Sequence, residues 1–163
     1  MRRLAVVAAA VAMLALAPTA HAWTWPASGE VLSPFVYGGD PYAGGQHRGI
    51  DVAGDGEEAV LAPASGVVSF AGTVGANGKV VAVETAGGYA VTLVHVGSIA
   101  VSKGDAVREG AVVGSIGPSG TPEHRVPYVH LGIRVASDPN GYVNPLTLLP
   151  PRGAPAPPPP LAP

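Results

Sequence analysis

Short runs of alternating apolar and polar or small residues, most of them bounded by glycine, recur through the middle of the chain. Alternation with a period of two is typical of a strand with one buried face, because successive strand side chains point to opposite sides. Valine is frequent in these runs, and β-branched residues favour strands over helices. The pattern predicts five strands, over residues 66–72, 79–84, 89–95, 111–117 and 129–135.

Two glycine-containing turns connect the first three predicted strands. Residues 75–78 separate the first strand from the second, and residues 86–88 separate the second from the third. Both turns have lengths that suit β-hairpins. No stretch of the chain has the period of an amphipathic helix. The sequence therefore predicts one compact, all-β, antiparallel domain, with a sheet of the sandwich or barrel-sandwich hybrid kind.

The beginning of the chain departs from this pattern. Two arginines precede an uncharged apolar run over residues 4–16, and Ala20-His21-Ala22 gives the small-x-small pattern that signal peptidase recognises. The run is shorter than the roughly 20 residues that a membrane span needs, and no cysteine follows it to carry a lipid. We therefore predict a signal peptide over residues 1–22 and no transmembrane anchor.

The other end of the chain is rich in proline. Residues 150–163 contain eight prolines in fourteen residues, and such a segment lacks most backbone donors and favours polyproline II. We predict a disordered tail there, either a spacer through a cell wall or a solvated end. Residues 23–149 then remain as a single domain, which is long enough for one hydrophobic core.

Charge and cysteine content narrow the classes of function. The 163 residues include 9 Lys and Arg, 11 Asp and Glu and no Cys, for a net charge of −2. Removal of the two arginines in the predicted signal peptide leaves 7 basic against 11 acidic residues, a net charge of −4. This balance offers no basic surface to a nucleic-acid partner. We expect a protein that is secreted or extracellular, or periplasmic if an outer membrane is present.

His47 and Asp51 form an H-x-x-x-D pair. In a straight strand the two side chains share a face but stand roughly 13 Å apart, at about 3.3 Å per residue. One zinc ion takes its ligands at about 2 Å, so a shared metal requires a bend between the two residues. Gly49 and the glycines before His47 can provide that bend.

His130 supplies a third candidate ligand. The odd positions of its predicted strand, over residues 129–135, are apolar and are expected to face the core, which puts Tyr128 and His130 on the opposite, open face. Two histidines and one carboxylate make a three-ligand zinc set with a fourth position open for water. The candidate metal ligands are therefore His47, Asp51 and His130, with Zn²⁺ as the cofactor.

Further motifs follow one another in a fixed order. After the H-x-x-x-D pair come APASGVV at 62–68, LVH at 93–95, KGDAVREG at 103–110, GPSG at 117–120, HLGIR at 130–134 and VNPL at 143–146. In this order and spacing, over about residues 38–149, the chain resembles the lysostaphin-type zinc endopeptidases. The resemblance implies a compact β-sheet core, a groove with one zinc, and cleavage of peptide bonds in bacterial peptidoglycan, whose peptides would be the partner.

The resemblance also implies roles for single residues. By position, His47, Asp51 and His130 match the zinc ligands of that family, and His95 matches one of its two non-ligand catalytic histidines. The family strand normally has the sequence H-x-H, whose first histidine works beside the metal, and here that position is Tyr128.

The exchange of histidine for tyrosine changes the available chemistry. An imidazole with a pKa near about 6.5 can accept a proton at neutral pH, whereas a phenol with a pKa near about 10 stays protonated. Tyr128 can still donate a hydrogen bond to a developing oxyanion. His95 and Tyr128 are therefore the candidate catalytic residues, and His124 is a candidate substitute for the missing base.

Three classes of function are open on this basis. The first is a secreted zinc endopeptidase that remodels or lyses the cell wall. The second is a catalytically degenerate, zinc-containing module of the same fold that binds the wall or regulates other proteins. The third is a carrier domain of the biotinyl, lipoyl or phosphocarrier kind, because sequences like that of residues 62–68 recur in such domains. Neither Lys79 nor Lys103 lies in the hairpin context that a swinging-arm carrier needs, and export opposes a cytoplasmic phosphocarrier.

Overall fold

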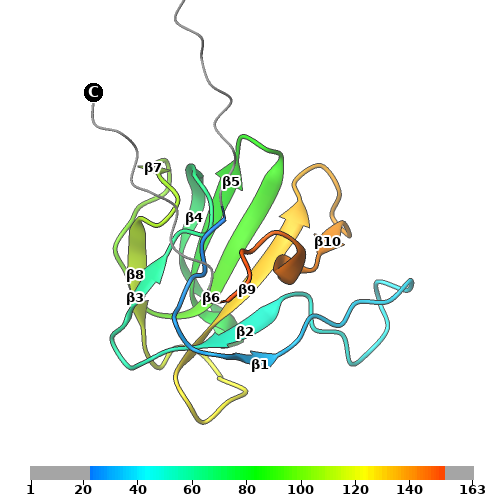
Figure 1. Ribbon diagram of the computed structural model, residues 1–163, viewed down its shortest axis with the longest axis horizontal. Helices are drawn as coiled ribbons and strands as arrows, with labels where there is room; N and C mark the ends of the chain where they lie inside the picture. The colour runs from blue at the N-terminus through cyan, green and yellow to red at the C-terminus, as the bar shows by residue number, and fades with distance from the viewer. Residues whose placement is uncertain (1–22, 153–163) are drawn as a thin grey trace, which may run out of the picture.

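The structure is a computed structural model that describes residues 23–152 (Figure 1). The predicted signal peptide and residues 153–163 of the predicted tail lie outside the described residues. The described part contains ten strands and two single-turn 3₁₀-helices. These elements are β1 (Val31–Ser33), β2 (Ile50–Ala53), β3 (Ala59–Leu61), β4 (Gly66–Val74), η1 (Gly75–Asn77), β5 (Gly78–Thr85), β6 (Tyr89–Ile99), β7 (Ala106–Val107), β8 (Val112–Ile116), β9 (Tyr128–Val135), β10 (Tyr142–Val143) and η2 (Pro145–Thr147).

The five predicted strands are present as β4, β5, β6, β8 and β9. Both predicted hairpins are present as well, since β4 pairs with β5 and β5 pairs with β6. The five strands that the alternation did not predict are two to four residues long, too short to show a period. Among the described residues, no helix is long and apolar enough to cross a membrane.

All strand pairs are antiparallel and belong to one branched sheet. The main path has the order β1-β2-β9-β6-β5-β4-β7, while β10 adds to β9, and β8 joins β3 to β6. Along one edge of β6, residues 89–94 pair with β9 and residues 96–99 pair with β8. Figure 1 shows the result, with β3 and β8 on one side of the long central strands and β9 and β10 on the other. The predicted all-β, antiparallel class is confirmed.

The core lies on one face of the central strands. In β9, the odd positions Val129, Leu131 and Ile133 are completely buried, as their alternation predicts, and Val135 at the strand end is half-buried. Buried residues of the neighbouring strands complete the cluster, among them Ile50, Val52, Val81, Val83, Val91 and Leu93. The even positions His130, Gly132 and Arg134 are partly exposed on the opposite face. That second face carries the polar side chains of β9, including the candidate ligand His130.

The beginning of the predicted tail packs against the first described residues. Trp25 donates its indole N–H to the carbonyl oxygen of Pro150 at 2.9 Å, and the Arg152 guanidinium lies 3.8 Å from the centre of the Trp25 ring. Arg152 also donates to the carbonyl oxygen of Ser28 at 2.7 Å. Residues 150–152 therefore contact the folded domain.

Candidate metal centre and catalytic cleft

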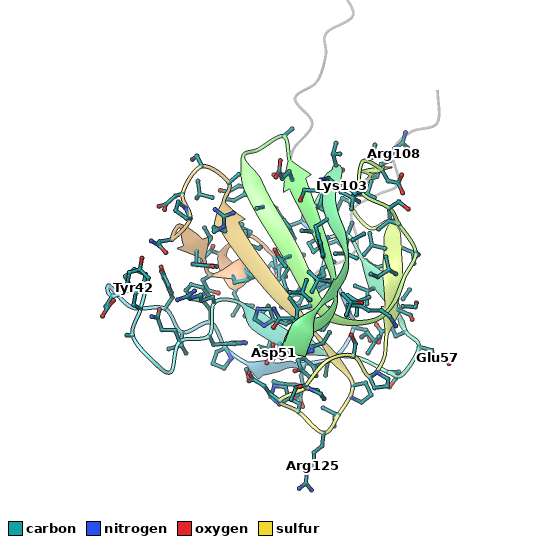
Figure 2. The ribbon with its side chains drawn as sticks, turned by 180° about the vertical axis from the view of Figure 1, so that it is seen from behind. Tyr42, Asp51, Glu57, Lys103, Arg108 and Arg125 are labelled. Atoms are coloured by element: carbon teal, nitrogen blue, oxygen red, sulfur yellow. The ribbon has the colours of Figure 1, made fainter. Side chains whose placement is uncertain are left out.

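Four residues from four strands lie opposite one another in a row across the sheet. Ser33 of β1 pairs with Asp51 of β2, Asp51 pairs with His130 of β9, and His130 pairs with Val94 of β6. Residues directly opposite in antiparallel strands point to the same face, so the pairing places Asp51 and His130 side by side. The Asp51 side chain is only 2% exposed. Figure 2 shows it near the end of the sheet at which the β8–β9 loop lies.

His47 reaches this pair because the chain bends at Gly49, directly before β2. His47 itself lies in an isolated bridge with Val36. A Cβ atom at residue 49 would lie 2.6 Å from Nε2 of His130 and 2.3 Å from the carbonyl oxygen of Leu131, so a side chain there would clash with β9. Glycine is the residue that permits this close approach. The bend predicted between His47 and Asp51 is confirmed.

The three candidate ligands converge on one point. Nε2 of His47 lies 3.2 Å from Oδ1 of Asp51 and 3.1 Å from Nδ1 of His130, and Nδ1 of His130 lies 2.8 Å from the same Oδ1. Ligands of a tetrahedral zinc ion at about 2.0–2.1 Å stand about 3.3 Å apart. The separations agree with this value to within about half an ångström, so these side chains could hold a metal ion after small shifts.

The protonation of the cluster also favours a cation. His47 places Nδ1 2.8 Å from the carbonyl oxygen of Pro34, which can only accept, so Nδ1 carries the hydrogen and Nε2 of the neutral ring keeps its lone pair. Burial opposes ionisation of Asp51, but hydrogen bonds with His130 and His124, together with charge interactions with His130 and His47, outweigh it and lower the pKa from 3.8 to about 2. A lone pair and a carboxylate therefore face each other, as the ligands of a cation do.

A β-bulge at His95 brings that residue to the same side of the sheet. Val94 and Val96 pair with consecutive residues of β5, which leaves His95 as an extra residue, and its φ is 63°. This left-handed conformation is uncommon outside glycine, and bulges often re-aim side chains next to active sites. Leu93 before the bulge and Val96 after it are both completely buried, so the alternation shifts by one residue. His95, which an unbroken strand would turn into the core, is half-buried and lines the cleft instead.

The tautomer of His95 is set by a backbone carbonyl. Nδ1 of His95 lies 3.0 Å from the oxygen of Ser119, so Nδ1 carries the hydrogen and Nε2 of the neutral ring can accept a proton. Ser119 is held in turn by the backbone N–H of Lys79, which donates to its Oγ at 2.5 Å. Ser119 contacts His95 through its backbone oxygen, so its side chain gives no sequence signal of this role.

Tyr128 lies on the same face as His130. The prediction that this position is open to solvent is wrong. Tyr128 is only 4% exposed, because the β8–β9 loop, residues 117–127, covers it. The backbone N–H of Glu123 donates to its hydroxyl oxygen at 2.9 Å. Burial raises the pKa of Tyr128, so the phenol stays protonated at neutral pH and retains a hydrogen to donate. Its ring centre lies 5.2 Å from that of His95.

His124, the candidate substitute, lies beside the metal ligands. Its Nε2 is 2.9 Å from Oδ2 of Asp51 and 3.1 Å from Oγ of Ser33. Its ring packs edge-on against Tyr128, with ring centres 4.8 Å apart. His124 therefore contacts the carboxylate of a candidate ligand. The sequence alone did not indicate that His124 would contact Asp51 or Ser33.

A cleft of about 170 Å³ lies beside the candidate metal ligands. Its lining includes the three candidate ligands together with Asn77, His95 and Tyr128. His130 and Val94 also line a neighbouring hollow of about 220 Å³, which continues past Gly132 to Arg48 and Arg134. The two hollows share these two residues and so adjoin along β6 and β9; together they are called the groove below, and the candidate metal ligands line its smaller part.

The fold and the cluster together define an all-β protein with a candidate single-metal centre, of two histidines and one carboxylate, in a groove over the sheet. The chain belongs to Peptidase family M23, which matches residues 45–145. This finding confirms the family resemblance, and it agrees with a donor set that could hold zinc.

Two relatives of this chain have names that describe different functions, one an enzyme and the other an activator. The chain is 32% identical over 121 residues to the DD-carboxypeptidase/endopeptidase Mpg of Neisseria meningitidis, covering 73% of this chain and 27% of that protein. It is 30% identical over 131 residues to the murein hydrolase activator NlpD of Escherichia coli strain K12, covering 80% of this chain and 32% of that protein. The chain thus spans about a third or less of the length of these relatives.

One solved structure has a similar fold, and the match covers nearly the whole length of the solved chain. It is a variant of the catalytic domain of the prophage-encoded M23 protein EnpA from Enterococcus faecalis, with 28% identity and a TM-score of 0.62. The match covers 77% of this chain and 95% of the EnpA chain. The described domain therefore corresponds to one M23 domain.

Proposed function

We propose that this protein is a secreted zinc endopeptidase that hydrolyses peptide bonds in bacterial peptidoglycan, in the cell wall or the periplasm. The observation that carries the proposal is the cluster of His47, Asp51 and His130, whose donor atoms lie within 3.2 Å of one another in the smaller part of the groove, which His95 also lines. The name of the Neisseria relative, a DD-carboxypeptidase/endopeptidase, supports a peptide bond as the target.

In this proposal His47, Asp51 and His130 hold the zinc ion. When bound, zinc supplies Lewis acidity toward the scissile carbonyl and the attacking water. His95 uses its free Nε2 to accept a proton from that water, because its Nδ1 is committed to the Ser119 carbonyl. Tyr128 keeps its proton and donates from its hydroxyl to the oxygen that becomes negative.

A second candidate function is a zinc-containing module that binds the wall or regulates other hydrolases without turnover. Tyr128 favours it, because a tyrosine stands where the family has the first histidine of H-x-H, and that position then offers no base near neutral pH. The name of the Escherichia coli relative, a murein hydrolase activator, is consistent with this role.

One experiment separates the two functions. Purified peptidoglycan is incubated with the zinc-loaded protein, and the soluble products are analysed by mass spectrometry for new amino termini. The endopeptidase releases them, and His95→Ala, which leaves the three candidate ligands in place, releases far fewer. A zinc-loaded protein that binds peptidoglycan without forming new amino termini would support the binding module instead.

A further inference from the structure

His124 contacts the oxygen of Asp51 that the candidate metal ligands do not use. Oδ1 of Asp51 faces His47 and His130, whereas Oδ2 lies 2.9 Å from Nε2 of His124. The Asp51 carboxylate is nearly inaccessible, at 2% exposure, so a polar contact there is not replaced by bulk water at low cost. The carboxylate thus has one oxygen for the cluster and one for His124.

The direction of this hydrogen bond follows from the chemistry of the two groups. An ionised carboxylate can only accept, so Nε2 of His124 carries the hydrogen and donates to Oδ2. Oγ of Ser33, 3.1 Å away, lies close to the same Nε2. Nε2 of His124 therefore lies within hydrogen-bond distance of both Asp51 and Ser33.

Three further contacts hold His124 in this place. The N–H of Thr121 donates to the carbonyl oxygen of Ala76 at 2.7 Å, which ties the loop to the β4–β5 hairpin. The N–H of Glu123 donates to the Tyr128 hydroxyl at 2.9 Å. The His124 ring meets the Tyr128 ring edge-on at 85°. The loop is thus anchored to the β4–β5 hairpin and to Tyr128 of β9, and these contacts fix the position of the His124 ring.

We propose that His124 is a positioning residue of the metal centre, an inference that rests on the metal site of the proposed function. By donating to Oδ2, His124 holds the carboxylate so that Oδ1 faces His47 and His130, where the three ligands would hold the metal. Removal of such a partner behind a metal ligand typically weakens metal affinity by about 10- to 100-fold.

The test compares the zinc affinity of four full-length proteins by competition with a chromogenic chelator: wild type, His124→Ala, His124→Gln and Arg125→Ala. We expect His124→Ala to bind zinc about 10- to 100-fold more weakly. His124→Gln should stay close to wild type, because its amide N–H can reach Oδ2. Arg125→Ala is the matched control, since Figure 2 shows Arg125 pointing away from the protein at the tip of the same loop.

Each outcome bears on a different part of the inference. Equal zinc affinity in His124→Ala and wild type would overturn it and leave the metal site intact. Equal weakening in His124→Ala and His124→Gln would show that packing, not hydrogen bonding, is responsible, and would also overturn it. Complete loss of zinc in His124→Ala, as in His47→Ala, would make His124 a ligand. A wild-type protein that binds no zinc would overturn the proposed function itself.

Discussion

Acid titration of Asp51 in the zinc-free protein tests the electrostatics of the cluster. Burial alone would raise the pKa of this carboxyl, but hydrogen bonds with His130 and His124, together with charge interactions with His130 and His47, lower it from 3.8 to about 2. The carboxylate is therefore more stable in the folded than in the unfolded protein. A depressed pKa adds stability that is present above the unfolded pKa, near 3.8, and is lost as pH falls toward the folded value of about 2.

The magnitude follows from the size of the shift. At 1.36 kcal/mol for each pKa unit, a change from 3.8 to about 2 corresponds to about 2 kcal/mol of unfolding free energy. Asp51→Asn removes this titration. The stability difference between the zinc-free wild type and Asp51→Asn should therefore shrink by about 2 kcal/mol between roughly pH 5 and pH 2.

The assay is urea unfolding in the presence of a chelator, followed by tryptophan fluorescence from Trp23 and Trp25, at several pH values. Asp55→Asn is the control, because Asp55 is exposed and its side chain accepts no hydrogen bond among the described residues. Parallel stability curves for wild type and Asp51→Asn across this pH range would refute the reasoning, because they would mean that the histidines do not stabilise the carboxylate.

Three further predictions concern the metal, the tyrosine and the tail. Alanine at any one of the three candidate ligands should abolish zinc binding, measured by metal analysis after dialysis, whereas His95→Ala should keep about one zinc per chain; loss of zinc from His95→Ala would show that His95 is misassigned. Tyr128→His should raise peptidoglycan turnover, by up to the 10²- to 10⁴-fold that is typical of a positioned general base, and Tyr128→Phe should lower it; unchanged inactivity of zinc-loaded Tyr128→His would argue for the binding module. Removal of residues 153–163 should leave the melting temperature unchanged. Removal of residues 150–163 should lower the melting temperature and shift Trp25 emission to the red, because it removes the contact of Arg152 with the Trp25 ring. Equal melting temperatures for the two truncated proteins would contradict this packing.

The long strands could be predicted because their signal is local, and the grouping of His47, Asp51 and His130 could be predicted from their donor types and the order of the motifs. In β9 the alternation around His130 fixes which side chains share a face, and in the His47–Asp51 segment Gly49 marks the bend. These features depend on residues close in the sequence. The period of two therefore predicted the long strands and the face on which His130 lies, whereas the contact of His130 with His47 and Asp51 joins residues 83 and 79 positions apart.

The parts that could not be predicted depend on contacts between distant residues. The bulge at His95 breaks the alternation, and its left-handed φ occurs at a residue that does not usually adopt it. Tyr128 is buried by a loop whose path is set by contacts with the β4–β5 hairpin, which strand patterning does not describe. His124 meets Asp51 for the same reason, 73 residues away in the sequence.

The most direct test of the central claim is hydrolysis of peptidoglycan in water enriched in ¹⁸O, followed by mass spectrometry of the products. If the zinc-loaded protein is an endopeptidase, each cleaved bond gives one new amino terminus and one ¹⁸O atom in the new carboxylate. The same products should be absent with His47→Ala, which removes a candidate metal ligand. Peptidoglycan that stays bound to the zinc-loaded protein, without new termini and without ¹⁸O, would contradict hydrolysis and identify a binding module.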